Sequence, residues 1–367
     1  MKQVFAADKI FTGDGWLSNY AVIMENGAIE RIVPKDEAPA VPRFYEDCFI
    51  APAFIDVQVY GAAGKLLAVE PTVDTLQTMQ REFAKTGTAL FQPTLATNTV
   101  GVFIQGIDAV RKYKQNGGKG VLGLHLEGPW LNDEKRGAHV KELIHPPTAK
   151  EVQELLEYGK GVITMITLAP EVCSSEILEL ISSYQIIISA GHSNATYEDA
   201  YNAMDAGVHA VTHLFNAMSG LHHRSPGLVG ATMNHPEVVA SIIPDGYHVD
   251  FAAIEIAKKI MGERLFAITD AVAETNAGYY RHQLIGDKYE CNGTLSGSAL
   301  SMHKAFVNLV KKANIPLDEA LRMCSLYPAK LLRCDNKYGR IASGASAEIV
   351  VLDTNLNIVD VISGSMH

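Results

Sequence analysis

The most constraining feature of this chain is a repeated alternation, along its central part, of short apolar runs with helical patterns. Eight runs rich in apolar and β-branched residues end in polar or glycine residues, and helical patterns lie between several of them. The expected strands are residues 49–59, 88–94, 121–127, 162–169, 186–191, 209–215, 238–244 and 265–270. This order predicts an α/β fold, a (β/α)8 barrel of the TIM type. A doubly wound sheet is the alternative, but its Gly-x-Gly-x-x-Gly turn is absent after the early strands.

Helix-start signals support the same interpretation. Residues 72–85 open with a threonine in the N-cap position, and residues 196–206 open with Thr-Tyr-Glu-Asp, an N-terminal capping pattern. Residues 297–333 have a helical pattern and are expected to close the barrel.

The two ends of the chain carry a different pattern. Short strand-like runs separated by turn signals occur in residues 1–48 and again near the C-terminus. Two terminal β segments that flank a barrel pair most simply with each other. We therefore expect residues 1–48 and 335–367 to form one small β-sandwich domain, and residues 49–334 to form the barrel.

Composition excludes several classes of protein. A net charge of −10 argues against a nucleic-acid partner, because phosphate neutralisation needs a basic face. The sequence contains no run of about 18 apolar residues, so we expect no membrane span. The N-terminal stretch also lacks the apolar region of a secretion signal. The five cysteines are widely spaced and odd in number, which is typical of a reducing cytoplasm and not of a disulfide framework or a zinc ribbon. We expect a cytoplasmic protein.

Four polar residues stand at the ends of expected strands. Glu127, His192, His213 and Asp270 end, or lie near the end of, the third, fifth, sixth and eighth runs. Because the carboxyl ends of barrel strands meet at one mouth, these side chains should converge. One carboxylate with two imidazoles is the ligand set of a catalytic metal site with open positions. For each histidine alone, the alternative is a structural hydrogen-bonding role.

Asp270 is the natural general base of such a site. A metal ion lowers the pKa of water towards about 7, and a carboxylate can then accept its proton and return it to a leaving group. The alternative is an aspartate that caps the following helix.

Histidines and an arginine elsewhere point to a polar ligand. Arg224 follows two histidines in a glycine- and proline-containing loop, and its planar guanidinium suits a phosphate or carboxylate; the alternative is a solvated basic loop. His248 could donate a hydrogen bond to the ligand, and His139 could polarise a carbonyl. His125 alternates in phase with Glu127 and is expected in the barrel core or behind the ligands.

Six stretches, in this order along the chain, carry a resemblance to a known family: HLEGPWLNDEKRGAH, GHSNATYEDA, THLFNAMSGLHHRSPGLVGA, DGYHVD, ITDA and GTLSGSALSM. With them the chain resembles the N-acetylglucosamine-6-phosphate deacetylases of the amidohydrolase superfamily over essentially its whole length. The resemblance implies a metal-dependent enzyme that hydrolyses the N-acetyl group of N-acetylglucosamine 6-phosphate to glucosamine 6-phosphate and acetate.

The resemblance also implies roles for individual residues. Glu127, His192 and His213 would hold the metal, Asp270 would be the catalytic acid and base, and His139 would help to stabilise the oxyanion. Members of the family are commonly homodimers, so Arg224 is a candidate for binding the phosphate in the partner's site. The implied contacts to the sugar phosphate are Ala138, His139, Asn216, Ala217, Arg224, His248, Leu295, Ser296 and Gly297.

The first barrel strand departs from the superfamily pattern. Members with two metals carry His-x-His there, and a subset of these deacetylases replaces it, often with Gln-x-Asn. This chain has Gln58 and Tyr60, so we expect one divalent metal in each subunit. Zinc suits the ligand set, and iron, cobalt or manganese could use the same ligands. The bulk of Tyr60 could fill the vacant site or touch the substrate.

Two rival functions remain at this stage. One is the same chemistry on another amino-sugar phosphate, such as N-acetylgalactosamine 6-phosphate. The other is a non-catalytic amino-sugar-phosphate binding protein, which the loss of the first-strand histidines makes plausible. The presence of Glu127, His192, His213 and Asp270 together argues against a binding protein, since binding alone needs no such set.

Overall fold

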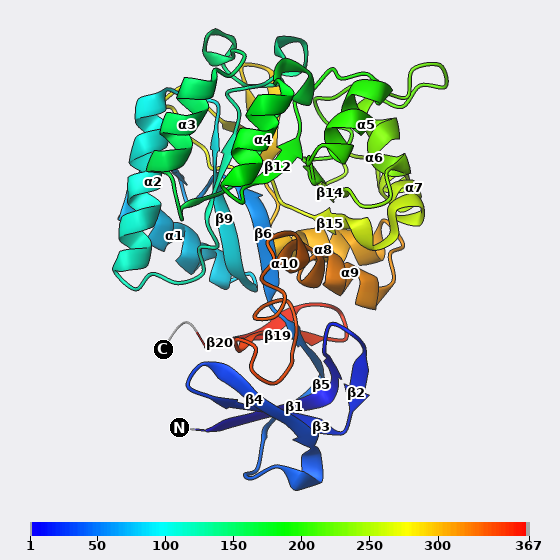
Figure 1. The fold of residues 1–367 in the computed structure, drawn as a ribbon. Helices are drawn as coiled ribbons and strands as arrows, with labels where there is room; N and C mark the ends of the chain where they lie inside the picture. The colour runs from blue at the N-terminus through cyan, green and yellow to red at the C-terminus, as the bar shows by residue number, and fades with distance from the viewer. Residues whose placement is uncertain (1, 365–367) are drawn as a thin grey trace.

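A computed structural model describes residues 2–364 as a barrel standing on a small sheet domain (Figure 1). Eight parallel strands pair in the order β15-β14-β13-β12-β11-β10-β9-β6. The sheet nearly closes on itself, because Val59 at the end of β6 forms a parallel bridge with Ala271, which lies four residues beyond β15. The predicted barrel is confirmed. Its strands are β6 (Phe54–Val59), β9 (Thr88–Ala96), β10 (Leu124–Glu127), β11 (Ile163–Leu168), β12 (Ile187–Ala190), β13 (Ala210–Val211), β14 (Val239–Ile242) and β15 (Leu265–Ala267).

Helices surround this sheet and follow the strands in sequence (Figure 1). The two expected helix starts are confirmed: the Thr72 side chain accepts from the Thr75 N–H, and Thr196 with Asp199 forms a capping box. The helices are α1 (Val73–Ala84), α2 (Val100–Gln115), α3 (Ala149–Tyr158), α4 (Ser175–Ser183), α5 (Tyr197–Asp205), α6 (Gly227–Asn234), α7 (Phe251–Met261), α8 (Met302–Lys311), α9 (Leu317–Met323) and α10 (Leu326–Leu331). No helix in this described part of the chain has the length and apolar character needed to cross a bilayer.

One expected strand is in fact two. Residues 49–59 divide between β5 (Arg43–Pro52), which belongs to the small sheet, and β6 of the barrel. The break falls where Pro52 lacks an N–H group and the N–H of Ala53 bonds to the carbonyl of Glu348, 2.9 Å away, in a C-terminal strand. The chain therefore passes directly from one domain to the other at this point.

The two ends of the chain form the expected small β domain. Its seven-stranded sheet has the order β20-β19-β5-β1-β3-β4, with β2 on β1, and Figure 1 shows both termini there. Alternate residues of β1 enter separate apolar clusters, so the sheet buries side chains on both faces. The division of the chain at residues 48 and 334 stays a prediction. The remaining strands of the sheet are β1 (Gln3–Phe11), β2 (Trp16–Ser18), β3 (Tyr20–Glu25), β4 (Ala28–Pro34), β19 (Glu348–Asp353) and β20 (Ile358–Ser363).

Two small antiparallel sheets follow the first and last barrel strands. A hairpin of β7 (Gly61–Ala62) and β8 (Lys65–Leu66) comes directly after β6. A three-stranded sheet of β16 (Gln283–Ile285), β17 (Lys288–Cys291) and β18 (Thr294–Ser298) lies between β15 and α8. Because both follow the carboxyl ends of barrel strands, both are placed to border the mouth of the barrel.

The barrel interior contains a polar layer among apolar side chains. His125 is fully buried, and its Nε2 lies 2.7 Å from the Thr167 hydroxyl. Burial lowers the pKa of this imidazole to about 4, so the ring is neutral at pH 7. His125 is therefore a core residue below the mouth, as expected.

Candidate active site

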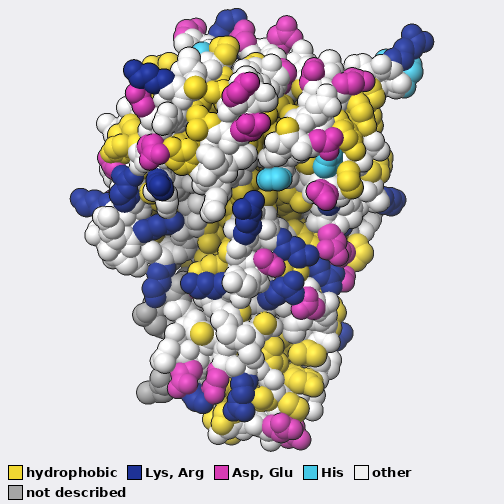
Figure 2. Space-filling view, viewed as in Figure 1, with side chains coloured by type: hydrophobic (Ala, Val, Ile, Leu, Met, Phe, Trp, Pro, Cys, Tyr) yellow, Lys and Arg dark blue, Asp and Glu magenta, His cyan; other side chains and the backbone are white. Residues whose placement is uncertain are grey.

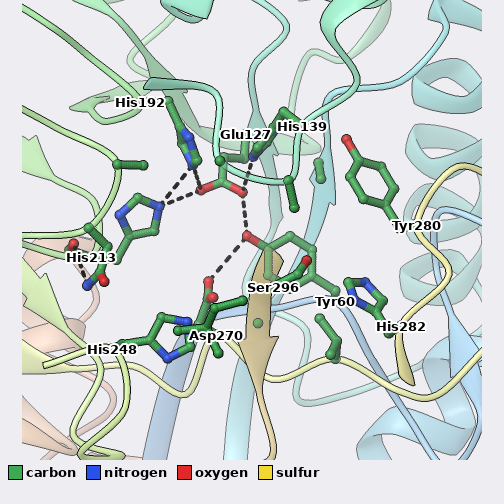
Figure 3. A pocket seen from close by; sticks show the side chains of 18 of the residues that line it. Tyr60, Glu127, His139, His192, His213, His248, Asp270, Tyr280, His282 and Ser296 are labelled. Carbon is green, nitrogen blue, oxygen red and sulfur yellow. Dashed lines mark hydrogen bonds and ion pairs between the residues drawn. The ribbon is translucent and has the colours of Figure 1, made fainter. Parts of the chain in front are cut away.

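Four predicted site residues meet at the carboxyl end of the barrel (Figure 3). Glu127 is the last residue of β10, while His192, His213 and Asp270 lie two or three residues beyond β12, β13 and β15. These three have φ angles of 48°, 38° and 56°, a left-handed backbone that non-glycine residues adopt rarely and mostly at functional sites. Each strand thus ends in a sharp turn that directs its side chain into the mouth. All four are buried.

The imidazoles of His192 and His213 converge on one carboxylate oxygen. Nε2 of His192 lies 3.4 Å and Nε2 of His213 lies 3.1 Å from Oε1 of Glu127, and the two nitrogens are 3.1 Å apart. Nδ1 of His192 donates to the carbonyl of Lys135 at 2.9 Å, which leaves the lone pair of Nε2 facing the cluster. One carboxylate with two imidazoles in such close contact is a ligand set of catalytic divalent metal sites. The residues therefore fit a divalent metal.

His139 approaches the same carboxylate from the loop after β10, but with a donor. The backbone N–H of Thr97 donates to its Nδ1 at 3.3 Å, so Nε2 carries the proton. That nitrogen lies 3.4 Å from Oε2 of Glu127. Distance alone also groups His139 with Glu127 and His192 as possible metal ligands. The tautomer favours a hydrogen-bond donor.

Electrostatics separate the two carboxylates of the site. Burial alone would raise the pKa of Glu127, but the hydrogen bond from His139 and the close contacts of His192 and His213 outweigh it and hold that pKa well below the usual range. Burial, then the negative charge of Glu127, raises the pKa of Asp270 well above its usual value. Burial, then the neighbouring His192, lowers the pKa of His139 to about 4, so this imidazole is neutral at pH 7.

Gln58 and Tyr60 occupy the space between the two carboxylates. The Gln58 amide nitrogen lies 2.8 Å from Oδ1 of Asp270 and 3.1 Å from Oε1 of Glu127. The Tyr60 hydroxyl donates to Oε2 of Glu127 and lies 3.3 Å from Oδ1 of Asp270. Figure 3 shows the phenol reaching between them. Two neutral donors thus stand where the superfamily pattern carries histidines, and Tyr60 also lines the adjoining cavity.

A cavity of about 320 Å³ opens over this cluster. Nearly all of the predicted sugar-phosphate contacts line it, namely Ala138, His139, Asn216, Ala217, His248, Leu295, Ser296 and Gly297. Arg224 is the exception. Its side chain is exposed, in a tight turn that an antiparallel β-bridge between His222 and Ser225 closes. The loop before α6 projects away from the barrel (Figure 1), and Figure 2 shows basic and histidine side chains at that tip.

Several cavity residues were not predicted from the sequence: Leu66, Ala68, Ala96, Glu134, Lys135, Gly137, Ile243, Val272, Tyr280 and His282. Many of them lie in the β7–β8 hairpin, in the loop after β10 and in the segment before β16, away from strand ends. One sequence feature could have indicated these residues: the long segment 271–293 that separates the last expected barrel strand from the glycine-containing stretch GTLSGSALSM. Long loops after barrel strands cover the mouth, so their polar aromatic residues are candidates.

A family model described as "Amidohydrolase family" matches residues 49–366, and one described as "NagA composite domain" matches residues 7–41. The first match covers most of the chain. The chain belongs to the amidohydrolase family. The flanking match agrees with the small sheet domain built from the chain ends.

Relatives of this amidohydrolase are deacetylases of amino-sugar phosphates. The N-acetylglucosamine-6-phosphate deacetylase of Haemophilus influenzae is 33% identical over 99% of this chain and 98% of that protein. The N-acetylgalactosamine-6-phosphate deacetylase of Escherichia coli O157:H7 is 30% identical over 98% and 97%. The crystal structure of the N-acetylglucosamine-6-phosphate deacetylase of Pasteurella multocida aligns with a TM-score of 0.95 at 32% identity, over 99% and 98% of the two chains. The resemblance stated from sequence is confirmed.

Proposed function

We propose that this amidohydrolase hydrolyses the N-acetyl group of N-acetylglucosamine 6-phosphate, giving glucosamine 6-phosphate and acetate. The observation that carries the proposal is the convergence of Glu127, His192 and His213 beside Asp270 at the floor of one cavity. The names of the relatives, which extend over nearly the whole chain, supply the substrate class.

The donor set of Glu127, His192 and His213 suits one divalent metal per subunit, with zinc the best match and iron, cobalt or manganese compatible. When bound, the metal polarises the amide carbonyl and lowers the pKa of the attacking water. Gln58 and Tyr60 support a single ion, because their donors already fill the space between Glu127 and Asp270.

The protein's own groups then move protons. Asp270 accepts a proton from the water that attacks the amide carbon, and it delivers that proton to the nitrogen as the carbon–nitrogen bond breaks. An amine anion is a very poor leaving group, so the second transfer is required. The Nε2–H of His139 donates to the oxygen that becomes negative, a contribution typically worth about 10²–10³ in rate.

We propose that Arg224 binds the phosphate in the cavity of a partner subunit in a homodimer. Its exposed position outside its own cavity supports this role. Replacing Arg224 by Ala should raise KM about 10–100-fold, the range for a charged hydrogen bond. Mixing Arg224→Ala with Asp270→Asn subunits should restore acetate release, because a hybrid dimer contains one complete site. An unchanged KM would contradict the phosphate role, and failure of the mixture would contradict action in trans.

The test of the main proposal is acetate release from N-acetylglucosamine 6-phosphate by the purified protein, before and after a chelator and after zinc is added back. We expect activity that disappears with the chelator and returns with zinc, together with one metal per subunit by elemental analysis. Absence of acetate with every divalent metal would reject the proposal.

The nearest alternative is the same reaction on N-acetylgalactosamine 6-phosphate. The relative from Escherichia coli O157:H7 that carries this name is nearly as similar as the others. Measuring kcat/KM for both epimers decides between them, and we expect the glucosamine epimer to be preferred.

We also infer a cytoplasmic location. The five cysteines are free in the structure, and this supports a reducing compartment.

A further inference from the structure

A buried aspartate–histidine pair lies in the turn between β14 and α7, on the wall of the cavity. Oδ2 of Asp245 is 2.6 Å from Nδ1 of His248, and the two side chains are only 6% and 8% exposed. His248 lines the cavity, and Figure 3 shows its ring beside Asp270. Among the described residues Asp245 does not line the cavity, so it can act on a ligand by contact only through His248, although its charge also helps to raise the pKa of Asp270.

The second oxygen of Asp245 is also occupied. Oδ1 accepts the backbone N–H groups of Tyr247 and His248, each at 2.8 Å. Burial acts to raise the pKa of Asp245, but the hydrogen bonds from the His248 side chain and from the backbone N–H groups of Tyr247 and His248 outweigh burial and lower the pKa. The group is therefore a carboxylate, which can only accept hydrogen bonds. It follows that Nδ1 of His248 carries a proton.

The turn itself is held from several sides. Gly246 has a φ of +84°, and a Cβ there would lie 2.7 Å from the ring of Phe251. Asn308 donates to the carbonyl of Pro244 at 2.8 Å, and Asp250 caps the start of α7. The pair thus has a fixed place relative to the cavity.

We propose that Asp245 is a positioning residue that holds His248 in the tautomer with its proton on Nδ1. The Nε2 atom in that tautomer presents a lone pair to the cavity, where it accepts a hydrogen bond from a ring hydroxyl of the bound amino-sugar phosphate. The inference rests on the proposed function for the identity of the ligand. It reverses the direction of the hydrogen bond expected from sequence, in which His248 was the donor.

The direct test is Asp245→Asn in the metal-loaded protein. The amide oxygen can still accept the two backbone N–H groups, but the NH₂ group must donate to Nδ1 and so moves the ring proton to Nε2. Nitrogen-15 NMR of His248 should show a protonated Nδ1 in the wild type and an unprotonated Nδ1 in the variant. A ring that keeps its proton on Nδ1 in the variant would overturn the inference.

The functional readout separates positioning from a general structural defect. Binding of glucosamine 6-phosphate should weaken about tenfold in Asp245→Asn, the usual effect of losing one hydrogen bond, and KM should rise similarly while kcat changes little. Asp250→Asn is the matched control, because the same substitution five residues away keeps a good cap and leaves the cavity untouched. Equal effects of the two substitutions would overturn the proposal.

Substrates that lack one hydroxyl identify the contact. Of the 1-deoxy, 3-deoxy and 4-deoxy forms of N-acetylglucosamine 6-phosphate, one should react poorly with the wild type and show no further loss with Asp245→Asn. The same penalty from Asp245→Asn on all three forms and on the parent sugar would contradict the hydroxyl contact. Wild-type protein that binds glucosamine 6-phosphate but releases no acetate would reject the proposed function alone, since the tautomer and the affinity are measured without turnover.

Discussion

The surroundings of Glu127 and of Asp270 differ sharply, although Gln58 and Tyr60 reach both carboxylates. Three imidazoles surround Glu127 and hold its pKa low, whereas burial and the charge of Glu127 raise the pKa of Asp270. Two carboxyl groups whose pKa values are driven apart in one site commonly divide into a fixed charge and a proton carrier. This difference supports the proposed roles, in which Glu127 is the permanent anion that binds a cation and Asp270 is the group that transfers a proton.

The substitution Asp270→Asn gives the strongest test of the difference between the two carboxylates. We expect kcat to fall about 10²–10⁴-fold, the usual contribution of a general acid–base. The metal content should remain at the wild-type level, because the proposed ligands are Glu127, His192 and His213. Acetate release and elemental analysis of the same sample provide the measurement. Loss of the metal would indicate that Asp270 is itself a metal ligand.

A second pair of substitutions tests which imidazoles bind the metal. His139→Gln should lower kcat about 10²–10³-fold, as for an oxyanion donor, and should retain the metal. His213→Gln should lose both metal and activity. Elemental analysis after dialysis against a weak chelator distinguishes the two variants, and a metal-free His139→Gln protein would make His139 a ligand.

A third buried carboxyl, Asp56, extends the comparison to a site without histidines. Burial raises its pKa to about 6, against lowering hydrogen bonds from Thr269 and Gln58. Because the folded pKa is the higher one, the stabilisation that Asp56 gives is full below its unfolded pKa of about 3.9 and is lost as pH rises through about 6. The wild type should therefore lose about 3 kcal/mol of unfolding free energy across this window relative to Asp56→Asn. Denaturant titrations at pH 4 and pH 7 measure the difference, and parallel pH profiles would contradict it.

The smallest effect is expected from Tyr60→Phe. The variant removes the hydroxyl that donates to Glu127 and approaches Asp270, while the ring and the Gln58 amide remain. A lost hydrogen bond to a charged group lowers the free energy of unfolding by about 1.5 kcal/mol. Urea unfolding of the metal-free protein gives this value. If the variant instead bound two metal ions, the hydroxyl itself would be what excludes the second ion.

The barrel and the four residues at its strand ends were predictable because both follow from local rules. Periodicity marks the strands, and parallel strands bring their carboxyl ends to one mouth, so Glu127, His192, His213 and Asp270 could be placed together without coordinates. The small β domain was predictable for a similar reason, since unpaired strand patterns at both ends need partners.

The rim of the cavity could not be predicted in the same way. Tyr280 lies there because its hydroxyl donates to the carbonyl of Thr97 at 2.6 Å, a contact between residues far apart in sequence. The arrangement of Gln58 and Tyr60 also depends on partners contributed by β10 and by the turn after β15. Such contacts depend on tertiary packing, and the hydrophobic periodicity of the sequence does not predict them.

The strand order of the small sheet has a consequence for the newly made chain. β5 lies between β1 and β19, and Cys48 to Pro52 pair with β19 along one edge. That edge carries Phe49, Ile50 and Ala51 and stays open while the whole barrel is synthesised, because β19 follows it. Open apolar strand edges on incomplete chains invite aggregation. The strands that follow the barrel therefore decide when this edge is protected, although none of their described residues lines the cavity.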